Sequence, residues 1–270
     1  MSRSDRVPPD AEGQVHVRLH RDGGVATVHL GAGERMNALG MAGWAELAAV
    51  ADRLAADPPA AVVVRGAGRD FCAGFDLREW VDANPRHVDA TFTAMETALR
   101  AIEGIPVPTV AVVHGAATGA GCQIMLACDL HVVSADARVG MPITRHGILV
   151  SAPFALRLAT LVGPARARDL LYTGRLLSGA EAAAAGMATH VHAEHEVDGA
   201  ADELLATLCA QPPEALRAVK RSVRTGLEPL RRAAAAAPAT PAADDAFPHR
   251  VAAFLTARRR EPAPGDGTTP

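Results

Sequence analysis

Two short glycine-containing segments carry backbone groups suited to holding a negatively charged oxygen. In the first, Ala73-Gly74-Phe75-Asp76, a small residue and a glycine let the backbone approach a ligand and turn the Phe75 N–H outward. In the second, Gly119-Ala120-Gly121 is expected to open a helix, so that its free N–H groups and the positive end of the helix dipole face a ligand. Each segment alone is equally typical of a tight turn into a helix.

The four cysteines suggest neither a metal site nor a disulfide framework. They form no CxxC pair and have no neighbouring histidine at metal-ligand spacing. We therefore expect reduced and mostly buried thiols at Cys72, Cys122, Cys128 and Cys209.

Alternating strands and helices are expected to position the two glycine segments. The predicted strands are Val15–Leu19, Val25–Leu30, Ala61–Val64, Val110–Val113 and Leu130–Ser134. The predicted helices are Gly40–Ala56, Thr91–Ile105 and the stretch that follows the turn HGAATGAG and runs through Cys128. This alternation indicates parallel pairing and an α/β core.

The C-terminal part has a different pattern. From Ala152 onward the chain is expected to be almost wholly helical, with a capping-box-like start at Ser178 in SGAE. Ala233–Asp245 is predicted to be a tether, because prolines interrupt its alanines. The expected organisation is a flexible N-terminus at 1–13, an α/β core at 14–195, a helical C-terminal region at 196–260 and a disordered tail at 261–270.

In their order and separation, the two glycine segments resemble the paired oxyanion-hole motifs of the crotonase (enoyl-CoA hydratase/isomerase) superfamily, FCAGxDL followed by NGxAxGGGxxL. The likeness extends from ERMNAL at Glu34–Leu39 through ACDL at Ala127–Leu130 to Tyr172–Val191. It is clear over Val15–Arg224 and looser beyond. The resemblance implies a repeated β-β-α spiral core with a C-terminal helical trimerisation region, assembled as a homotrimer or a hexamer made of two trimers.

The resemblance also implies a substrate and a role for the two glycine segments. The Phe75 and Ala120 amides would together bind the oxygen of an acyl-CoA thioester as an enolate develops. Preorganised donors of this kind can each contribute about 3 to 4 kcal/mol. No cofactor is implied, because coenzyme A is part of the substrate.

Further residues are assigned to substrate binding by the same resemblance. The residues expected along the adenine and pantetheine path are Arg35, Met36, Ala73, Asp76 and Leu77. Phe254 and Arg258 would close over the nucleotide from the C-terminal tail, although a solvated basic helix end is the alternative interpretation of Arg258.

The sequence departs from the family pattern where hydratases carry two catalytic glutamates. Those positions hold Gln123 and Ile143, and the third carboxylate position of isomerase-like members holds Ser151. None of these side chains can act as a carboxylate general base. Gln123 and Ser151 remain polar candidates, and Ile143 would line the substrate pocket.

Histidine is the remaining candidate for acid–base work. His146 has the most suitable ordinary pKa, and a packing histidine on a surface loop is its alternative interpretation. His114 replaces the asparagine common in the family's turn, so we expect it to support that turn by hydrogen bonding.

Composition narrows the classes of partner. With 49% hydrophobic residues, the 270-residue chain can bury a large core, and its net charge of −3 argues against nucleic-acid and membrane-surface binding. No apolar run approaches the roughly 20 residues of a membrane span, and the polar start lacks a signal-peptide core, so we expect a cytoplasmic protein.

Two hypotheses of function follow. The first is an acyl-CoA enzyme catalysing hydration or dehydration, isomerisation or C–C cleavage through an enolate, and the second is a non-catalytic acyl-CoA binder that acts as a pathway partner or regulator. A P-loop or Rossmann nucleotide binder is disfavoured, because neither GxxxxGK[ST] nor GxGxxG with a following ribose-binding acid is present.

Overall fold

The computed structural model describes residues 16–81, 83–237 and 246–260. The side chains of residues 248 and 257–260 are not among those described. The predicted flexible N-terminus at 1–13 and disordered tail at 261–270 therefore lie outside the described residues.

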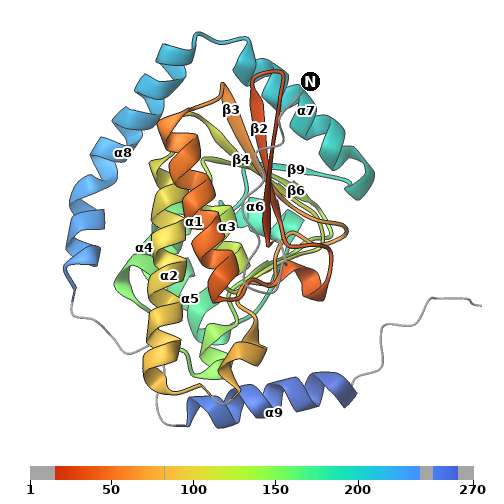
Figure 1. The fold of residues 1–270 in the computed structure, drawn as a ribbon, viewed down its shortest axis with the longest axis vertical. Coiled ribbons are helices and arrows are strands. Elements are labelled where there is room, and N and C mark those ends of the chain that lie inside the picture. The colour runs from red at the N-terminus through yellow and green to blue at the C-terminus, as the bar shows by residue number, and fades with distance from the viewer. Residues whose placement is uncertain (1–15, 82, 238–245, 261–270) are drawn as a thin grey trace, which may run out of the picture.

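A six-stranded sheet forms the centre of the molecule (Figure 1). Its strands, in spatial order, are β1 (Val17–Asp22), β2 (Val25–Leu30), β3 (Ala61–Gly66), β4 (Thr109–Val113), β6 (Leu130–Ser134) and β9 (His190–His192). The first two strands form an antiparallel hairpin, and all later pairs are parallel. The parallel α/β core predicted from the sequence is confirmed, with β1 shifted toward Asp22.

A second, smaller sheet contains three short strands. They are β5 (Ala116–Thr118), β7 (Arg138–Gly140) and β8 (Leu177–Ser178), in that spatial order. The prediction that HGAATGAG is only a turn is therefore wrong, because its middle forms β5. Pairing of β5 with β7 fixes the chain just before the second glycine segment.

Helices cover both faces of the large sheet. On one face lie α1 (Met41–Ala56), α2 (Pro85–Gly104) and α3 (Ala120–Ala127), which share a core cluster with alternate strand residues such as Val62 and Val64. On the other face α7 (Val197–Cys209) packs against the intervening residues such as Val63. Short helical turns connect these layers: η1 (Arg35–Asn37), η2 (Leu77–Trp80), η3 (Ile143–His146) and η4 (Glu194–Glu196).

The C-terminal part is mainly helical, as predicted. Its other helices are α4 (Ala152–Val162), α5 (Pro164–Thr173), α6 (Gly179–Ala185), α8 (Pro213–Ala235) and α9 (Phe247–Arg260). β8 and β9 interrupt it, and the capping box at Ser178 is confirmed.

The predicted tether begins too early, because Ala233–Ala235 belong to α8 and alanine is the best helix former. The rest of the predicted tether falls largely on residues 238–245, outside the described residues.

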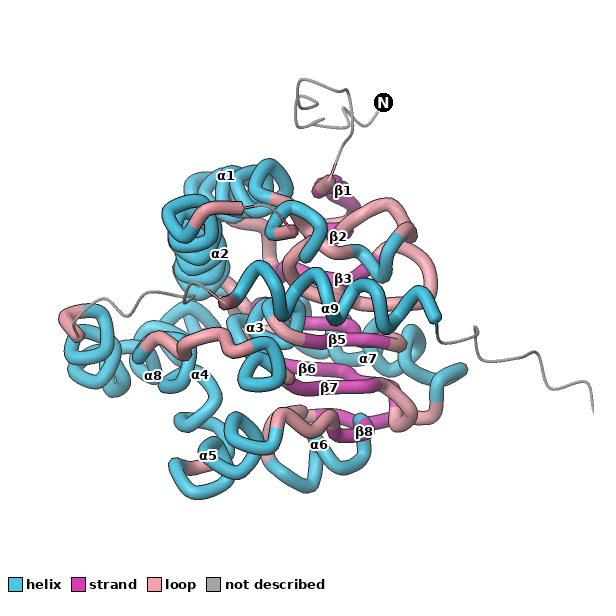
Figure 2. Tube along the Cα trace, turned by 90° about the horizontal axis from the view of Figure 1, so that it is seen from below, coloured by secondary structure: helices cyan, strands magenta, loops and turns pink. Residues whose placement is uncertain are grey.

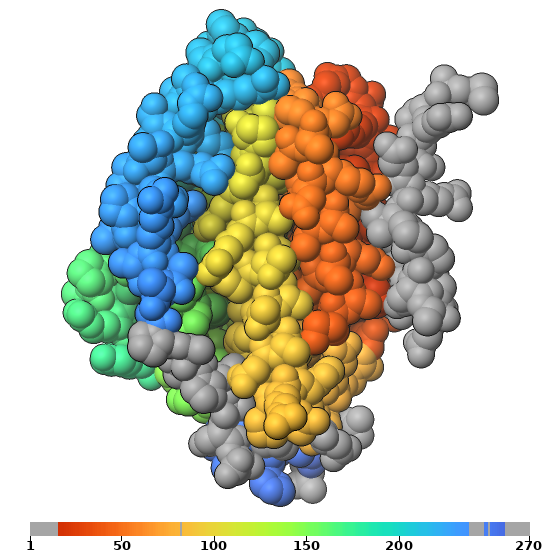
Figure 3. Space-filling view, turned by 60° about the vertical axis from the view of Figure 1, so that its left-hand side comes forward, coloured from red at the N-terminus to blue at the C-terminus, as the bar shows by residue number. Residues whose placement is uncertain are grey.

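The outer helices occupy distinct places. Figure 3 shows α8 on the same face of the molecule as α1 and α2, and Figure 1 shows α9 at the bottom of the molecule, so that it lies in front of β3 and β5 in Figure 2. α9 packs against η2 and η3, so the C-terminal helix contacts the segments that follow the first glycine loop and β7. None of the described helices is long and apolar enough to cross a membrane.

Candidate active site

The two glycine segments lie against each other. Gly74 has a φ of 95°, and a Cβ atom at this residue would lie 2.7 Å from the Ala120 nitrogen and 2.9 Å from the Thr118 oxygen. The approach is held by backbone hydrogen bonds, in which Cys72 N donates to Ala116 O (2.8 Å) and Thr118 N donates to Cys72 O (3.0 Å). Only glycine permits this contact, since any side chain at position 74 would push the loops apart.

The Phe75 and Ala120 amides are the unpaired donors at this contact. Within the described part of the chain, neither N–H has a hydrogen-bond acceptor. Around Phe75 the neighbouring groups are used instead, because Leu39 N donates to Gly74 O (2.8 Å) and Asp76 N donates to Leu39 O (3.0 Å). Ala120 is the first residue of α3, so its N–H lies at the positive end of the helix dipole. Two free donors on adjoining loops suit an oxygen that gains negative charge.

A backbone run before α1 supports the first glycine segment. Arg35, Met36 and Asn37 all have positive φ values, of 50°, 53° and 56°. Met36 O accepts a hydrogen bond from Ala73 N (2.8 Å), which joins this run to the loop that carries Phe75. Such left-handed conformations cost free energy and persist only where surrounding contacts hold them.

Asn37 provides those contacts and is a support residue that sequence reasoning missed. Its Oδ1 accepts from Gly33 N (2.9 Å), and its Nδ2 donates to Ala67 O (2.9 Å) and Asp70 O (2.7 Å). Asn37 is only 1% exposed, so its side-chain amide is fully used inside the protein. The asparagine in the motif ERMNAL was the available signal.

Three of the predicted coenzyme A residues, Arg35, Asp76 and Leu77, lie beside Phe75. Asp76 forms an ion pair with Arg35 (3.3 Å) and a bidentate ion pair with Arg78. Burial raises the pKa of Asp76, and the Arg35 cation offsets part of that rise. Leu77 begins η2 directly after this ion pair.

Aromatic side chains cover the Phe75 loop. The Phe75 ring stacks on Trp80 with ring centroids 4.3 Å apart, and Trp80 also contacts Phe92 (5.5 Å) and Phe247 (5.4 Å). Phe247 is fully buried at the start of α9. The C-terminal helix is therefore packed onto the loop that presents the Phe75 amide.

Gln123 is buried and fully engaged, one turn along α3 from Ala120. Its Oε1 accepts a hydrogen bond from Arg157 (2.7 Å), and its Nε2 donates to Met141 Sδ (2.9 Å) and Phe154 O (3.4 Å). Sequence reasoning kept Gln123 as a polar candidate for contact with the substrate. In this structure the side chain contacts protein groups instead.

Arg157 on α4 is the second support residue that sequence reasoning missed. It forms ion pairs with Glu103 (2.8 Å) and Glu96 (3.1 Å) of α2. Burial opposes the charge of Arg157, but Glu103 and Glu96 together raise its pKa above the ordinary value. The cation that holds Gln123 is therefore permanent.

Three more predicted site residues follow one another along the segment after β7: Ile143, expected to line the pocket, and the acid–base candidates His146 and Ser151. Ile143 is 5% exposed and apolar, and Ser151 is the N-cap of α4, with Oγ accepting from Phe154 N (3.4 Å). The His146 ring meets Phe254 of α9 edge-on, with centroids 4.4 Å apart. Burial and, to a smaller extent, Arg145 lower the pKa of His146.

The predicted contact of Arg258 with the nucleotide involves a side chain that lies outside the described residues.

His114 does not support the glycine turn with its side chain, so that expectation is wrong. Its Nδ1 lies 2.7 Å from Glu194 Oε1 and its Nε2 lies 3.4 Å from Asp198 Oδ1. The ring thereby connects the end of β4 to η4 and α7.

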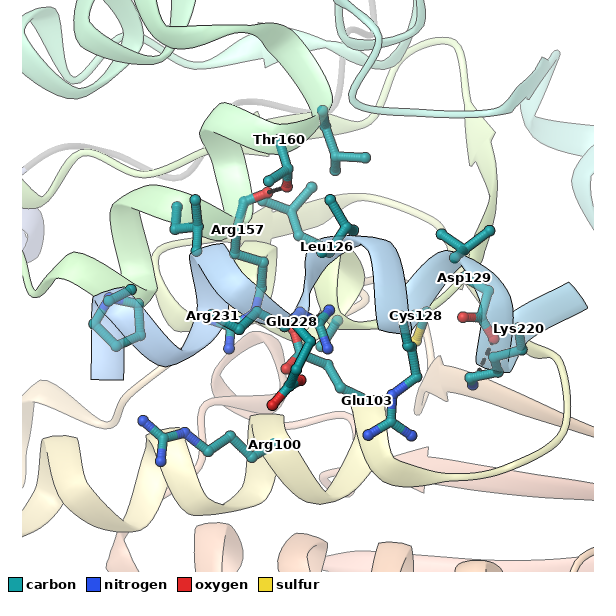
Figure 4. Close-up of a pocket in the computed structure, with 18 of the residues that line it drawn as sticks. Arg100, Glu103, Leu126, Cys128, Asp129, Arg157, Thr160, Lys220, Glu228 and Arg231 are labelled. Atoms are coloured by element: carbon teal, nitrogen blue, oxygen red, sulfur yellow. Dashed lines mark hydrogen bonds and ion pairs between the residues drawn. The ribbon is translucent and has the colours of Figure 1, made fainter. Parts of the chain in front are cut away.

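A cavity of about 670 Å³ lies away from the glycine segments (Figure 4). It is open to solvent on one side and lies between α8, α2, α4 and the C-terminal end of α3, near Leu126 and Cys128, whereas Ala120 is at the other end of that helix. Within the described residues, no group of three or more His, Cys, Asp or Glu side chains is arranged to hold a metal ion.

Comparisons with known proteins agree with this geometry. A family model for enoyl-CoA hydratase/isomerase matches residues 20–244. Enoyl-CoA hydratase domain-containing protein 2, mitochondrial, from Homo sapiens is 32% identical over 231 residues, which cover 83% of this chain and 79% of that protein. Methylglutaconyl-CoA hydratase, mitochondrial, from Rattus norvegicus is 32% identical over 162 residues, which cover 58% of this chain and 51% of that protein.

Solved structures give the same result. The crystal structure of an enoyl-CoA hydratase/isomerase from Xanthobacter autotrophicus Py2 superimposes with a TM-score of 0.79 at 29% identity, covering 92% of this chain and 94% of that chain. An enoyl-CoA hydratase from Mycobacterium avium subsp. paratuberculosis K-10 gives a TM-score of 0.78 at 27% identity, covering 94% and 100%. The chain belongs to the enoyl-CoA hydratase/isomerase family.

Proposed function

We propose that this protein is an enzyme that binds an acyl-CoA thioester and stabilises an enolate at the thioester carbonyl. The observation that carries the proposal is the meeting of two unpaired backbone donors, Phe75 N–H and Ala120 N–H, on adjoining loops. Family membership supplies the acyl-CoA substrate class. A thioester oxygen bound between the donors gains stabilisation as negative charge develops on it.

The coenzyme A moiety is proposed to lie along the residues beside Phe75. Arg35, Met36, Ala73, Asp76 and Leu77 form one connected group there. The guanidinium of Arg35 provides a half-exposed positive charge for a phosphate group. Phe254 of α9, together with Arg258, is proposed to cover the nucleotide.

Acid–base chemistry by the usual pair of glutamates is not available at positions 123 and 143. His146 is the titratable candidate that remains from the sequence, and burial, with a smaller contribution from Arg145, lowers its pKa and so favours the neutral ring. Gln123 and Ser151 are proposed to keep the surrounding segments in place rather than to transfer protons, since each side chain is held by neighbouring protein groups.

A second candidate function is a non-catalytic acyl-CoA binder. The burial of Gln123 at 0% exposure favours it, because no part of that side chain is accessible to a substrate or water in this conformation. A protein with this second function would bind the same acyl-CoA thioesters but would not convert them.

Calorimetric titration of the full-length protein with acetyl-, crotonyl- and octanoyl-CoA tests both candidates. We expect dissociation constants in the micromolar range, since the nucleotide part supplies contacts for every acyl group. Folded protein that takes up none of the three would refute acyl-CoA binding. Binding without conversion of any acyl-CoA in a broad panel would leave the non-catalytic binder as the function.

A further inference from the structure

A thioester enolate can be formed in two ways, and they make different demands on a protein. Removal of a proton from the α-carbon needs a general base placed at that carbon. Loss of CO₂ from an α-carboxylate needs none, because the electron pair of the broken C–C bond becomes the enolate. Whether a general base lies near Phe75 and Ala120 therefore indicates which class of substrate the protein can convert.

The carboxylates carried by the first glycine segment and its flanks are all engaged in holding the backbone. Asp70 Oδ1 accepts a hydrogen bond from Ala116 N (2.8 Å), and Asp76 is paired with Arg35 and Arg78. Glu79 Oε2 accepts from Met41 N at the start of α1 (3.1 Å). Each carboxylate would have to leave a structural partner before it acted as a base.

The second glycine segment also lacks a basic side chain. Gln123 has no basic group, and Arg157 holds its Oε1 through an ion-paired network with α2. Ile143 is apolar, and the Ser151 hydroxyl caps α4. His146 packs edge-on against Phe254, and its lowered pKa makes it a weaker base than an ordinary histidine.

Apolar side chains flank both donor segments. Trp80 stacks on Phe75, and Met141, which follows Gly140, contacts Gln123 beside the first turns of α3. The Gly119 amide donates to Gly140 O (2.9 Å), which fixes Met141 near the start of the helix. A carboxylate loses hydration in such surroundings, whereas CO₂ and the product acyl group are apolar.

We propose that the substrate class is a 2-carboxyacyl-CoA, a thioester of the malonyl type, and that the reaction is its decarboxylation. This inference rests on the proposed function of the Phe75 and Ala120 amides. The bond between the α-carbon and the carboxylate breaks, CO₂ leaves, and the electron pair forms an enolate whose oxygen the two amides hold. One proton from water then adds to the α-carbon and gives the shortened acyl-CoA. Atoms and charge balance without an oxidant, reductant or further reactant.

The test uses the full-length protein with malonyl-CoA and methylmalonyl-CoA in D₂O. Mass spectrometry measures the product acyl-CoA, its deuterium content and the CO₂ released. We expect decarboxylation at least 100-fold above the buffer rate, with deuterium at the product α-carbon, because one oxyanion donor alone is worth about 10²- to 10³-fold. Butyryl-CoA should show no α-deuterium exchange, and crotonyl-CoA should not be hydrated at a comparable rate.

Two variants locate the reaction. Ala120→Pro removes the donor at the first residue of α3, where proline is compatible with a helix. Ala152→Pro is the matched control, since Ala152 is the exposed first residue of α4. We expect Ala120→Pro to lose at least 100-fold in rate and Ala152→Pro to retain the wild-type rate. Thermal unfolding checks that both variants are folded. If Ala120→Pro does not fold, the decarboxylation rate of the wild-type protein relative to the buffer rate decides the question.

The outcomes separate this inference from the proposed function. Wild-type protein that binds both 2-carboxyacyl-CoAs but releases no CO₂ above the buffer rate would overturn decarboxylation and leave acyl-CoA binding intact. Rapid α-deuterium exchange in butyryl-CoA would show a working base and would also overturn it. Failure to bind any acyl-CoA, measured by calorimetry on the same preparation, would refute the proposed function as well.

Discussion

Arg157 is the residue on which the buried polar contacts beside α3 converge. It is 8% exposed and connects Gln123 of α3 to Glu96 and Glu103 of α2. A buried charge is tolerable only when its partners are in place. The ion-paired network thus fixes α3, whose first amide is the Ala120 donor.

Replacement of Arg157 by methionine should therefore be strongly destabilising. It would leave Glu96, Glu103 and the Gln123 carbonyl without their shared donor, and we expect a loss of about 3 kcal/mol. Arg100→Met is the control, because Arg100 pairs with the same Glu96 at the surface and should cost less than about 1 kcal/mol. Urea unfolding measures both. Equal losses in the two variants would contradict the central role of Arg157.

At this scale the sequence could predict some residues and not others. Phe75 and Ala120 lie in motifs whose glycines have local conformational requirements, and the contact through Gly74 agrees with them. Arg157 and Gln123 are 34 positions apart, and nothing in the local pattern pairs them. The same is true of His114, whose partners lie on η4 and α7.

At the level of elements, α8 is attached to the core by polar contacts from Lys220, Arg224 and Arg231. Lys220 is the main one, with Nζ donating to Asp129 Oδ2 (2.6 Å) and Val107 O (2.9 Å) (Figure 4). Asp129 also accepts from Thr109 N (2.8 Å), so the contact joins α8 to the start of β4. Between the attachment points lies the cavity of about 670 Å³.

We expect Lys220→Met to loosen this helix. Loss of a buried charged donor should cost about 2 kcal/mol or more, since hydrogen bonds to charged groups contribute about 1.5 to 3 kcal/mol. Arg221→Met on the exposed side of the same helix should change stability by less than about 0.5 kcal/mol. Hydrogen exchange should show faster opening of α8 in Lys220→Met alone. An unchanged rate of hydrogen exchange in α8 of Lys220→Met would contradict the role of Lys220 in holding α8 to the core.

The long elements were predictable and the short ones were not. Buried runs such as Val110–Val113 and the apolar spacing of Gly40–Ala56 identify their strand and helix, which the structure places at Thr109–Val113 and Met41–Ala56. β5, β7, β8 and β9 contain two or three residues each, too few for any periodicity to appear. Their positions depend on pairing across the folded chain.

At the level of the whole molecule, α8 presents apolar side chains to solvent. Val219, Val223 and Leu230 are 63%, 59% and 53% exposed, at spacings that place them near one side of the helix. Exposed apolar patches of this kind mark association surfaces. We propose that they are covered by other copies of the chain in a homotrimer or hexamer.

Light scattering at micromolar concentration should accordingly give three or six times the mass of one chain. Val223→Asp should shift the distribution toward smaller species, because it places a charge in the proposed interface. Arg221→Asp is the control, because Arg221 is exposed on the opposite side of α8 from Val219 and Val223. A wild-type protein that remains a stable monomer would refute the assembly.

Stability of the whole fold should fall in mild acid because of His131. This residue is 2% exposed, and burial lowers its pKa to about 4 from 6.5. The unfolded chain therefore binds the proton first, so stability is complete above pH 6.5 and declines as the pH falls toward 4. The total loss is about 3 kcal/mol, since each pKa unit corresponds to about 1.4 kcal/mol.

His131→Leu isolates this contribution. His29 and His146 also have lowered pKa values, and they remain in both proteins. Urea unfolding at pH 7.5 and pH 5 should show a smaller loss of stability in the variant than in the wild type. Identical losses would assign the acid sensitivity to other groups.

The most direct test of the central claim is the absorption spectrum of bound cinnamoyl-CoA, whose conjugated thioester carbonyl reports hydrogen bonding at its oxygen. If the Phe75 and Ala120 amides hold that oxygen, the wild-type protein and Ala152→Pro should shift the band to longer wavelength. Folded Ala120→Pro should bind the thioester, as calorimetry would confirm, with a much smaller shift. Wild-type protein that binds cinnamoyl-CoA without shifting its band, or Ala120→Pro that shifts it equally, would contradict the account.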